Sequence, residues 1–243
     1  MSPRESDEWF PLEPEEHEAQ AHAVLSLLGP TPRRVIDLGA GGGRLAGPLV
    51  EAGHRVLAID HDPEAIAACR RLGAETRRAD LRSPEFAPGF DDGPADAAIL
   101  LGGTLMEFVD PLEAASLLRR VRAHVRPGGW LAIDGSLTEV WDDVGEGSWA
   151  TGVSEDGAWQ LIWAAGDAVV ALRRGDRVDP DDWEIGPEDR LLRLWSRGAL
   201  ALLAEASGWG QPEPVDFRTL LRLERTPDAK GEDAPPRGRQ DGA

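Results

Sequence analysis

The most informative part of the chain is the stretch Val35-Ile36-Asp37-Leu38-Gly39-Ala40-Gly41-Gly42-Gly43. An apolar run typical of a buried strand leads into a glycine-rich turn, and Leu45, Leu49 and Ala52 then follow at helical spacing. Glycine permits positive φ angles and lets a ligand approach the backbone closely. The first turn of a helix also offers N–H groups that have no partner within the helix. The stretch therefore predicts a nucleotide-like ligand where a strand meets a helix.

Around this turn, short apolar runs alternate with helical patterns. The predicted strands are Arg34–Leu38, Arg55–Asp60, Glu75–Ala79, Ala95–Leu101 and Trp130–Asp134. All but the third are nearly continuous in apolar residues, which is typical of strands that a parallel sheet buries on both faces. Asp62-Pro63 and Asp110-Pro111 predict helix starts, because Asp caps a helix and Pro suits its first position. The pattern predicts an α/β fold with a doubly wound, mostly parallel sheet.

Pro48 interrupts the helix that follows the glycine turn. Proline lacks the N–H group that a helix interior requires, so this helix either starts late or kinks there. A leading helix is predicted over Glu15–Leu28. A further helix over Arg197–Ser207 and a strand over Phe217–Leu223 continue the pattern near the end of the chain.

The composition changes after Ser136. Residues 137–189 hold five of the nine tryptophans, and a hairpin is predicted with Gly166-Asp167 as its turn. We therefore predict four parts. They are a helical cover over residues 1–32, a cofactor-binding core over 33–136 and 190–225, a β-rich lid insertion over 137–189, and a disordered tail over 226–243.

Charge and residue counts disfavour several classes of function. The formal net charge is −18, whereas proteins that bind nucleic acid usually neutralise phosphates with a basic surface. One cysteine excludes an internal disulfide, and the five histidines lack metal-ligand spacing, so no metal is expected. No apolar run is long enough to span a membrane, and the first residues do not resemble a signal peptide. We expect a cytoplasmic protein with no nucleic-acid or membrane partner.

Two kinds of nucleotide site remain possible for the glycine turn. The dinucleotide fingerprint Gly-x-Gly-x-x-Gly would need glycine at Arg44 or, in another register, at Ala46. Asp60 ends the next strand 21 residues after Gly39, where an acid can accept both ribose hydroxyls. A second acid, Asp80, follows the third strand, and a dinucleotide site does not require it. Arg44 and Asp80 thus argue against a dinucleotide site, and an NAD(P)-linked oxidoreductase is kept as the alternative function.

The order of Asp37, the three glycines, Asp60 and Asp80 resembles that of class I, Rossmann-like S-adenosylmethionine-dependent methyltransferases of the small-molecule type. The segment 96–105 is similar to the fourth motif of these enzymes, and 125–131 to their Leu-x-Pro-Gly-Gly turn. Gly103 departs from the pattern, since many members have Asn there. The resemblance implies a seven-stranded sheet with an antiparallel last strand. It also implies S-adenosylmethionine as cofactor and S-adenosylhomocysteine as product.

The resemblance also implies roles along the cofactor. The methionine part would lie along residues of the first and fourth strand ends, namely Asp37, Gly39, Gly41, Leu101 and Gly102. Gly43 would open the helix, and Asp60 would hold the ribose. The adenine would lie against His61, Asp80 and Leu81. A chain that binds this cofactor but carries out non-methylating chemistry is a further alternative.

The substrate side is predicted from the position of the insertion. Ligands of open α/β sheets bind beyond the carboxyl ends of the strands, and the insertion leaves from that edge. We expect Trp141 and Met106 to face the substrate, and Glu107 or His22 to act as base if the nucleophile is protonated. Asp134 is followed by Gly135 rather than by the Asn of metal-dependent types. The predicted reaction is methyl transfer to an O or N atom of a small molecule, such as a secondary metabolite. The oligomeric state stays open.

Overall fold

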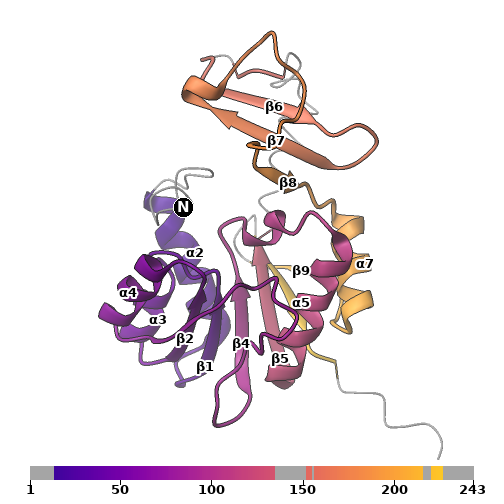
Figure 1. Ribbon diagram of the computed structural model, residues 1–243. Helices are drawn as coiled ribbons and strands as arrows, with labels where there is room; N and C mark the ends of the chain where they lie inside the picture. The colour runs from indigo at the N-terminus through magenta and orange to yellow at the C-terminus, as the bar shows by residue number, and fades with distance from the viewer. Residues whose placement is uncertain (1–13, 135–151, 155, 216–219, 227–243) are drawn as a thin grey trace, which may run out of the picture.

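The computed structural model describes residues 14–134, 152–154, 156–215 and 220–226 (Figure 1). Its main sheet has seven strands in the order β3-β2-β1-β4-β5-β10-β9. The strands are β1 (Arg34–Leu38), β2 (Arg55–Asp60), β3 (Glu75–Arg78), β4 (Ala95–Leu100), β5 (Val125–Asp134), β9 (Glu213–Pro214) and β10 (Leu220–Glu224). The first five pair in parallel, whereas β10 runs antiparallel to both β5 and β9. The predicted fold class is confirmed.

Helices cover both faces of this sheet. They are α2 (Pro14–Leu28), α3 (Ala46–Glu51), α4 (Pro63–Arg71), α5 (Pro111–His124) and α7 (Arg197–Ser207). Ile36 and Leu38 of β1 belong to the core cluster that contains α5 and α7, and Val35 belongs to the cluster that contains α2 and α3 (Figure 1). Alternate residues of the strand are thus buried on opposite faces, which explains why the predicted strands are continuously apolar.

The helix ends follow the local sequence. The side chain of Asp62 accepts a hydrogen bond from the N–H of Glu64 at 2.8 Å, and Asp110 accepts one from Leu112 at 2.8 Å. Both N-caps are therefore confirmed. The helix after the glycine turn starts late, at Ala46, which places Pro48 in the first turn. An N–H group in the first turn has no helical acceptor, so proline is tolerated there without a kink.

The strand boundaries differ from the prediction at β5. This strand begins at Val125 rather than Trp130, and its register against β4 shifts between Ala95 and Ala97. A Cβ atom at Gly129 would lie 2.5 Å from the carbonyl oxygen of Asp96, so glycine lets the irregular segment approach β4. The short strands β8 (Leu191–Arg193) and β9 were not predicted. The last strand is described from Leu220 onward.

A second, antiparallel sheet consists of β6 (Trp159–Trp163), β7 (Val169–Arg174) and β8, in that order. The predicted hairpin is confirmed, and Gly166 has the positive φ of 79° that its tight turn requires. This sheet lies above the main sheet in Figure 1. Leu161, Val170 and Leu172 nevertheless belong to the core cluster of α5 and α7. The division into core and lid stays a prediction, and the predicted tail beyond residue 226 lies outside the described residues.

None of the described helices is both long and apolar enough to cross a membrane.

Candidate functional site

A cleft opens beyond the carboxyl ends of β1, β2 and β4. Its walls come from the glycine turn, from residues 60–62 and 80–82, and from residues 101–104. Leu192 of β8, in the second and smaller sheet, and Arg190, just before that strand, also line it. Together with its open mouth, the cleft encloses about 1160 Å³.

The glycine turn is held against the neighbouring strands. The N–H groups of Gly39 and Ala40 donate to the carbonyl oxygen of Ile59 at 2.8 and 3.1 Å. Gly39 has a φ of +69°, and a Cβ atom there would lie 2.6 Å from Oγ1 of Thr104. Glycine is therefore required at this position both for the backbone conformation and for the close packing of the segment after β4.

Asp60, at the end of β2, is buried and organises the middle of the cleft. Its Oδ2 accepts from the N–H of Gly41 at 2.9 Å, and its Oδ1 accepts from the N–H of Asp62 at 2.9 Å and lies 3.3 Å from Nδ1 of His61. A carboxylate offers about four acceptor positions, so it can still accept ligand hydroxyls. This arrangement fits the predicted ribose site.

Asp37, on β1, lies at the floor of the cleft and is only 3% exposed. Its Oδ2 is buried and has no hydrogen-bond partner within the described part of the chain. Burial raises the pKa of this carboxyl to about 7, with Arg44 acting in the opposite direction and Asp60 in the same one. A buried oxygen without a partner is costly, and a cationic ligand group would satisfy it. The α-ammonium of a methionine moiety is such a group.

The segment after β4 is held from below by Asp134, at the end of β5. The N–H of Gly103 donates to Oδ2 of Asp134 at 2.8 Å, and Gly102 and Gly103 have φ angles of 74° and 76°. Burial raises the pKa of Asp134. This residue does not line the cleft, and the sequence alone assigns it no role there. Its position at the end of an apolar strand, like that of Asp60, was the available signal.

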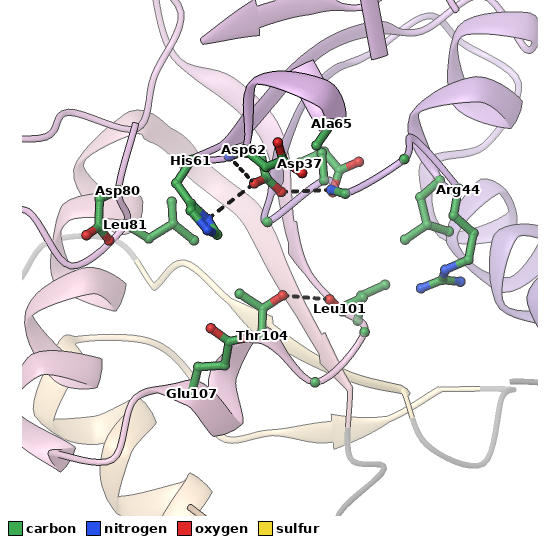
Figure 2. A pocket seen from close by; sticks show the side chains of 18 of the residues that line it. Asp37, Arg44, His61, Asp62, Ala65, Asp80, Leu81, Leu101, Thr104 and Glu107 are labelled. Atoms are coloured by element: carbon green, nitrogen blue, oxygen red, sulfur yellow. Dashed lines mark hydrogen bonds and ion pairs between the residues drawn. The ribbon is translucent and has the colours of Figure 1, made fainter. Parts of the chain in front are cut away.

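The two ends of the cleft differ in character. At one end, Asp80 is exposed and its Oδ1 accepts from the N–H of Arg82 at 2.9 Å, while Leu81 is buried. Figure 2 shows these residues at the opposite end from Arg44, with His61 and Asp62 between them. A cofactor with its ribose at Asp60 would thus have its adenine at Asp80 and Leu81 and its methionine part at Asp37 and Arg44.

Among the described residues, three predicted site residues do not line the cleft. Gly43 instead separates two helices, since a Cβ atom there would lie 2.5 Å from Cδ1 of Leu72 and 3.3 Å from Sγ of Cys69. Met106 is 1% exposed and belongs to the core. His22 is exposed on α2, and Trp141 lies outside the described residues.

Glu107 does line the cleft, at its rim. It forms an ion pair with Arg190 of the small-sheet segment, and its Oε2 lies 3.5 Å from Nη2 of Arg82. To act as a base, Glu107 would need a substrate that displaces one of these arginines. No group of three or more potential metal ligands occurs among the residues that the structure describes.

Comparisons with known proteins agree with this geometry. Residues 35–129 match the family model described as a methyltransferase domain. The chain is 39% identical over 111 residues to a Mycobacterium tuberculosis protein described as a methyltransferase, and 32% identical over 151 residues to the ribosomal protein L11 methyltransferase of Geobacter metallireducens. The matches cover 46% and 59% of this chain, and 43% and 47% of those proteins. The chain thus spans less than half the length of these relatives.

Solved structures share the fold at low sequence identity. An S-adenosylmethionine-dependent methyltransferase from Clostridium acetobutylicum superposes with a TM-score of 0.62 at 13% identity, covering 89% of this chain and 94% of that one. The sugar N-methyltransferase KedS8 from Streptoalloteichus gives a TM-score of 0.55 at 21% identity, with 87% of each chain covered. These likenesses define a Rossmann-like methyltransferase fold. The domain match adds that residues 35–129 of this chain are similar to a methyltransferase domain.

Proposed function

We propose that this protein transfers a methyl group from S-adenosylmethionine to an O or N atom of a small molecule. The proposal rests on one observation, namely that residues from two different sheets line the cleft. Asp37 and Asp60 line it from the Rossmann-like sheet, and Arg190 and Leu192 line it from the small sheet. Cofactor and acceptor would therefore meet in a space that the small sheet covers on one side.

The residues present fit the cofactor. Asp60 would accept the ribose hydroxyls, the backbone of Leu81 would meet the adenine ring, and Asp37 would receive the ammonium group. When bound, the cofactor supplies a methyl group that its positive sulfonium already activates. What the protein adds is alignment of the two reactants and exclusion of water, which together can supply much of the rate enhancement. A base is needed only for a nucleophile that is protonated at working pH.

The small-molecule acceptor is supported by the covered cleft and by one structural neighbour. KedS8 is a sugar N-methyltransferase of similar fold. One relative is named as a methyltransferase of ribosomal protein L11, which is a protein substrate. A protein acceptor is therefore the competing possibility. The net charge of −18 argues against a nucleic-acid acceptor. A role in secondary metabolism belongs to the same proposal.

The methyltransferase and the two alternative functions differ first in the cofactor that the protein should bind. Titration calorimetry of the full chain with S-adenosylhomocysteine, NAD and NADP is expected to detect binding of the first alone. Binding of NAD or NADP in its place would favour an oxidoreductase. Binding of S-adenosylhomocysteine without any detectable transfer would favour non-methylating chemistry.

The acceptor class is tested with methyl-labelled S-adenosylmethionine. A cell extract is divided by ultrafiltration into a small-molecule and a macromolecular fraction, and each is incubated with the protein. We expect label in the small-molecule fraction, and a second incubation of the macromolecular fraction after nuclease treatment controls for RNA. Label confined to protein would overturn the small-molecule acceptor while leaving the methyltransferase activity in place.

A further inference from the structure

We infer that Arg44, held by Gln20 of the leading helix, binds the carboxylate of the cofactor's methionine moiety. This inference rests on the proposed cofactor and assigns one more contact to it. Arg44 follows the last glycine of the turn and lines the cleft. At the sequence level it served only as evidence against a dinucleotide site.

Arg44 lies at the end of the cleft where the methionine part is proposed to bind, and no residue has yet been assigned to the carboxylate of that part. With adenine at Leu81 and ribose at Asp60, the methionine part extends towards the far end of the cleft, where Figure 2 shows Arg44. The side chain lies near the segment after β4, since a Cβ atom at Gly102 would be 3.7 Å from its Nη2. The guanidinium therefore lies between the glycine turn and the fourth strand end.

Gln20 fixes the guanidinium from the opposite side. Its Oε1 accepts from Nη1 of Arg44 at 2.6 Å, and the residue is 1% exposed on α2. A buried polar side chain is expected to have a partner, and this one joins the leading helix to the cofactor turn. Because an amide is neutral, this hydrogen bond orients Arg44 without neutralising its charge. Gln20 is thus a positioning residue.

Charge at this end of the cleft is complementary to an amino acid head group. Asp37 offers a buried carboxylate oxygen without a partner, and Arg44 offers a planar cation a short distance away along the same wall. A methionine moiety carries one ammonium and one carboxylate. Arginine suits the latter because its fork can donate two parallel hydrogen bonds to one carboxylate.

The test compares two ligands that differ only in this carboxylate. Calorimetric titration of the full chain uses S-adenosylhomocysteine and its decarboxylated analogue, S-adenosyl-3-thiopropylamine. We expect the wild type to bind the first about 10- to 100-fold more tightly. In the Arg44→Met variant this preference is expected to disappear, through loss of affinity for S-adenosylhomocysteine alone. Arg44→Lys keeps the positive charge but not the two parallel donors of the guanidinium, so this variant should lose only part of the preference.

Gln20→Met tests the positioning role. It is expected to reduce the preference for the carboxylate, and the double variant with Arg44→Met should be no worse than Arg44→Met alone, because both changes act on one interaction. Arg71→Met removes an exposed arginine on the last turn of α4 and is the matched control. Equal binding of both ligands by the wild type would overturn the inference, as would an unchanged preference in Arg44→Met. If the wild type binds neither ligand, the proposed function itself fails.

Discussion

At the scale of single residues, two neighbouring carboxylates have opposite environments. Asp60 accepts hydrogen bonds from two backbone N–H groups, whereas Oδ2 of Asp37 has none from the described residues. Donors stabilise an ionised carboxylate, and burial without donors destabilises it. The first residue is thus prepared to accept ligand hydroxyls and the second to receive a cation.

The ribose contact is tested with Asp60→Ala. The change removes charge-assisted hydrogen bonds worth roughly 1.5–3 kcal/mol each, so affinity for S-adenosylhomocysteine is expected to fall at least tenfold by calorimetry. Asp91→Ala, at a side chain that is 95% exposed, is the control. Unchanged affinity in a folded Asp60→Ala protein would show that the ribose lies elsewhere.

Asp37 makes the stability of the ligand-free protein depend on pH. Burial raises its pKa from 3.8 to about 7 in the folded state, with Arg44 and Asp60 as the charged neighbours. Between these values the folded protein binds more protons than the unfolded chain, so the free energy of unfolding falls as pH rises. Burial raises the pKa of Asp134 too, which acts in the same direction.

Asp37→Asn is therefore expected to be more stable than the wild type at about pH 8, and to gain much less at about pH 5. Urea denaturation of both proteins without ligand measures the difference. An equal gain at both pH values would mean that Asp37 does not titrate in this window.

At the scale of elements, the junction between α3 and α4 depends on one glycine. Gly43 has a φ of +87° and faces Leu72 and Cys69, whereas the neighbouring Gly42 has open space around its Cβ position. A side chain at Gly43 would combine backbone strain with a clash. The close packing of Gly43 against α4 is therefore a structural reason for glycine at this position, whether or not the residue also contacts the cofactor.

Gly43→Ala is expected to lower the free energy of unfolding by about 1–3 kcal/mol. Gly42→Ala, the matched control, should stay within about 0.5 kcal/mol of the wild type. Both values come from urea denaturation. If the two substitutions cost the same, the helix junction does not depend on Gly43.

At the scale of the whole molecule, contacts distant in sequence join the small sheet to the main one. Glu107 pairs with Arg190 at the rim of the cleft, and Nε1 of Trp195 donates to the carbonyl oxygen of Leu105 at 3.1 Å. Both members of the ion pair line the cleft. We therefore expect the pair to hold the small-sheet segment over a bound cofactor, so that its loss would ease cofactor escape.

Arg190→Gln is expected to speed S-adenosylhomocysteine release about two- to fivefold, because partly exposed ion pairs contribute up to about 1 kcal/mol. Stopped-flow tryptophan fluorescence measures the release rate. Arg177→Gln breaks an ion pair with Asp189 inside the small-sheet segment and is the matched control. Equal rates in the two variants would contradict a closing role for the Glu107 pair.

The sequence by itself determined the parallel sheet, the helix caps and the two strand-end carboxylates that line the cleft. These features depend on local patterns. A strand that is apolar throughout must be covered on both faces, and Asp62 can cap only the helix that follows it. Asp37 and Asp60 end up in one cleft because the carboxyl ends of adjacent parallel strands lie side by side.

The tertiary structure alone decided the partners of side chains from distant elements. Arg44 meets Gln20, and Glu107 meets Arg190, through the packing of helix and sheet rather than through any spacing along the chain. Met106 shows the limit most clearly. An apolar side chain after β4 suits a substrate wall as well as a core, and only the packing of the surrounding elements buries it, at 1% exposure.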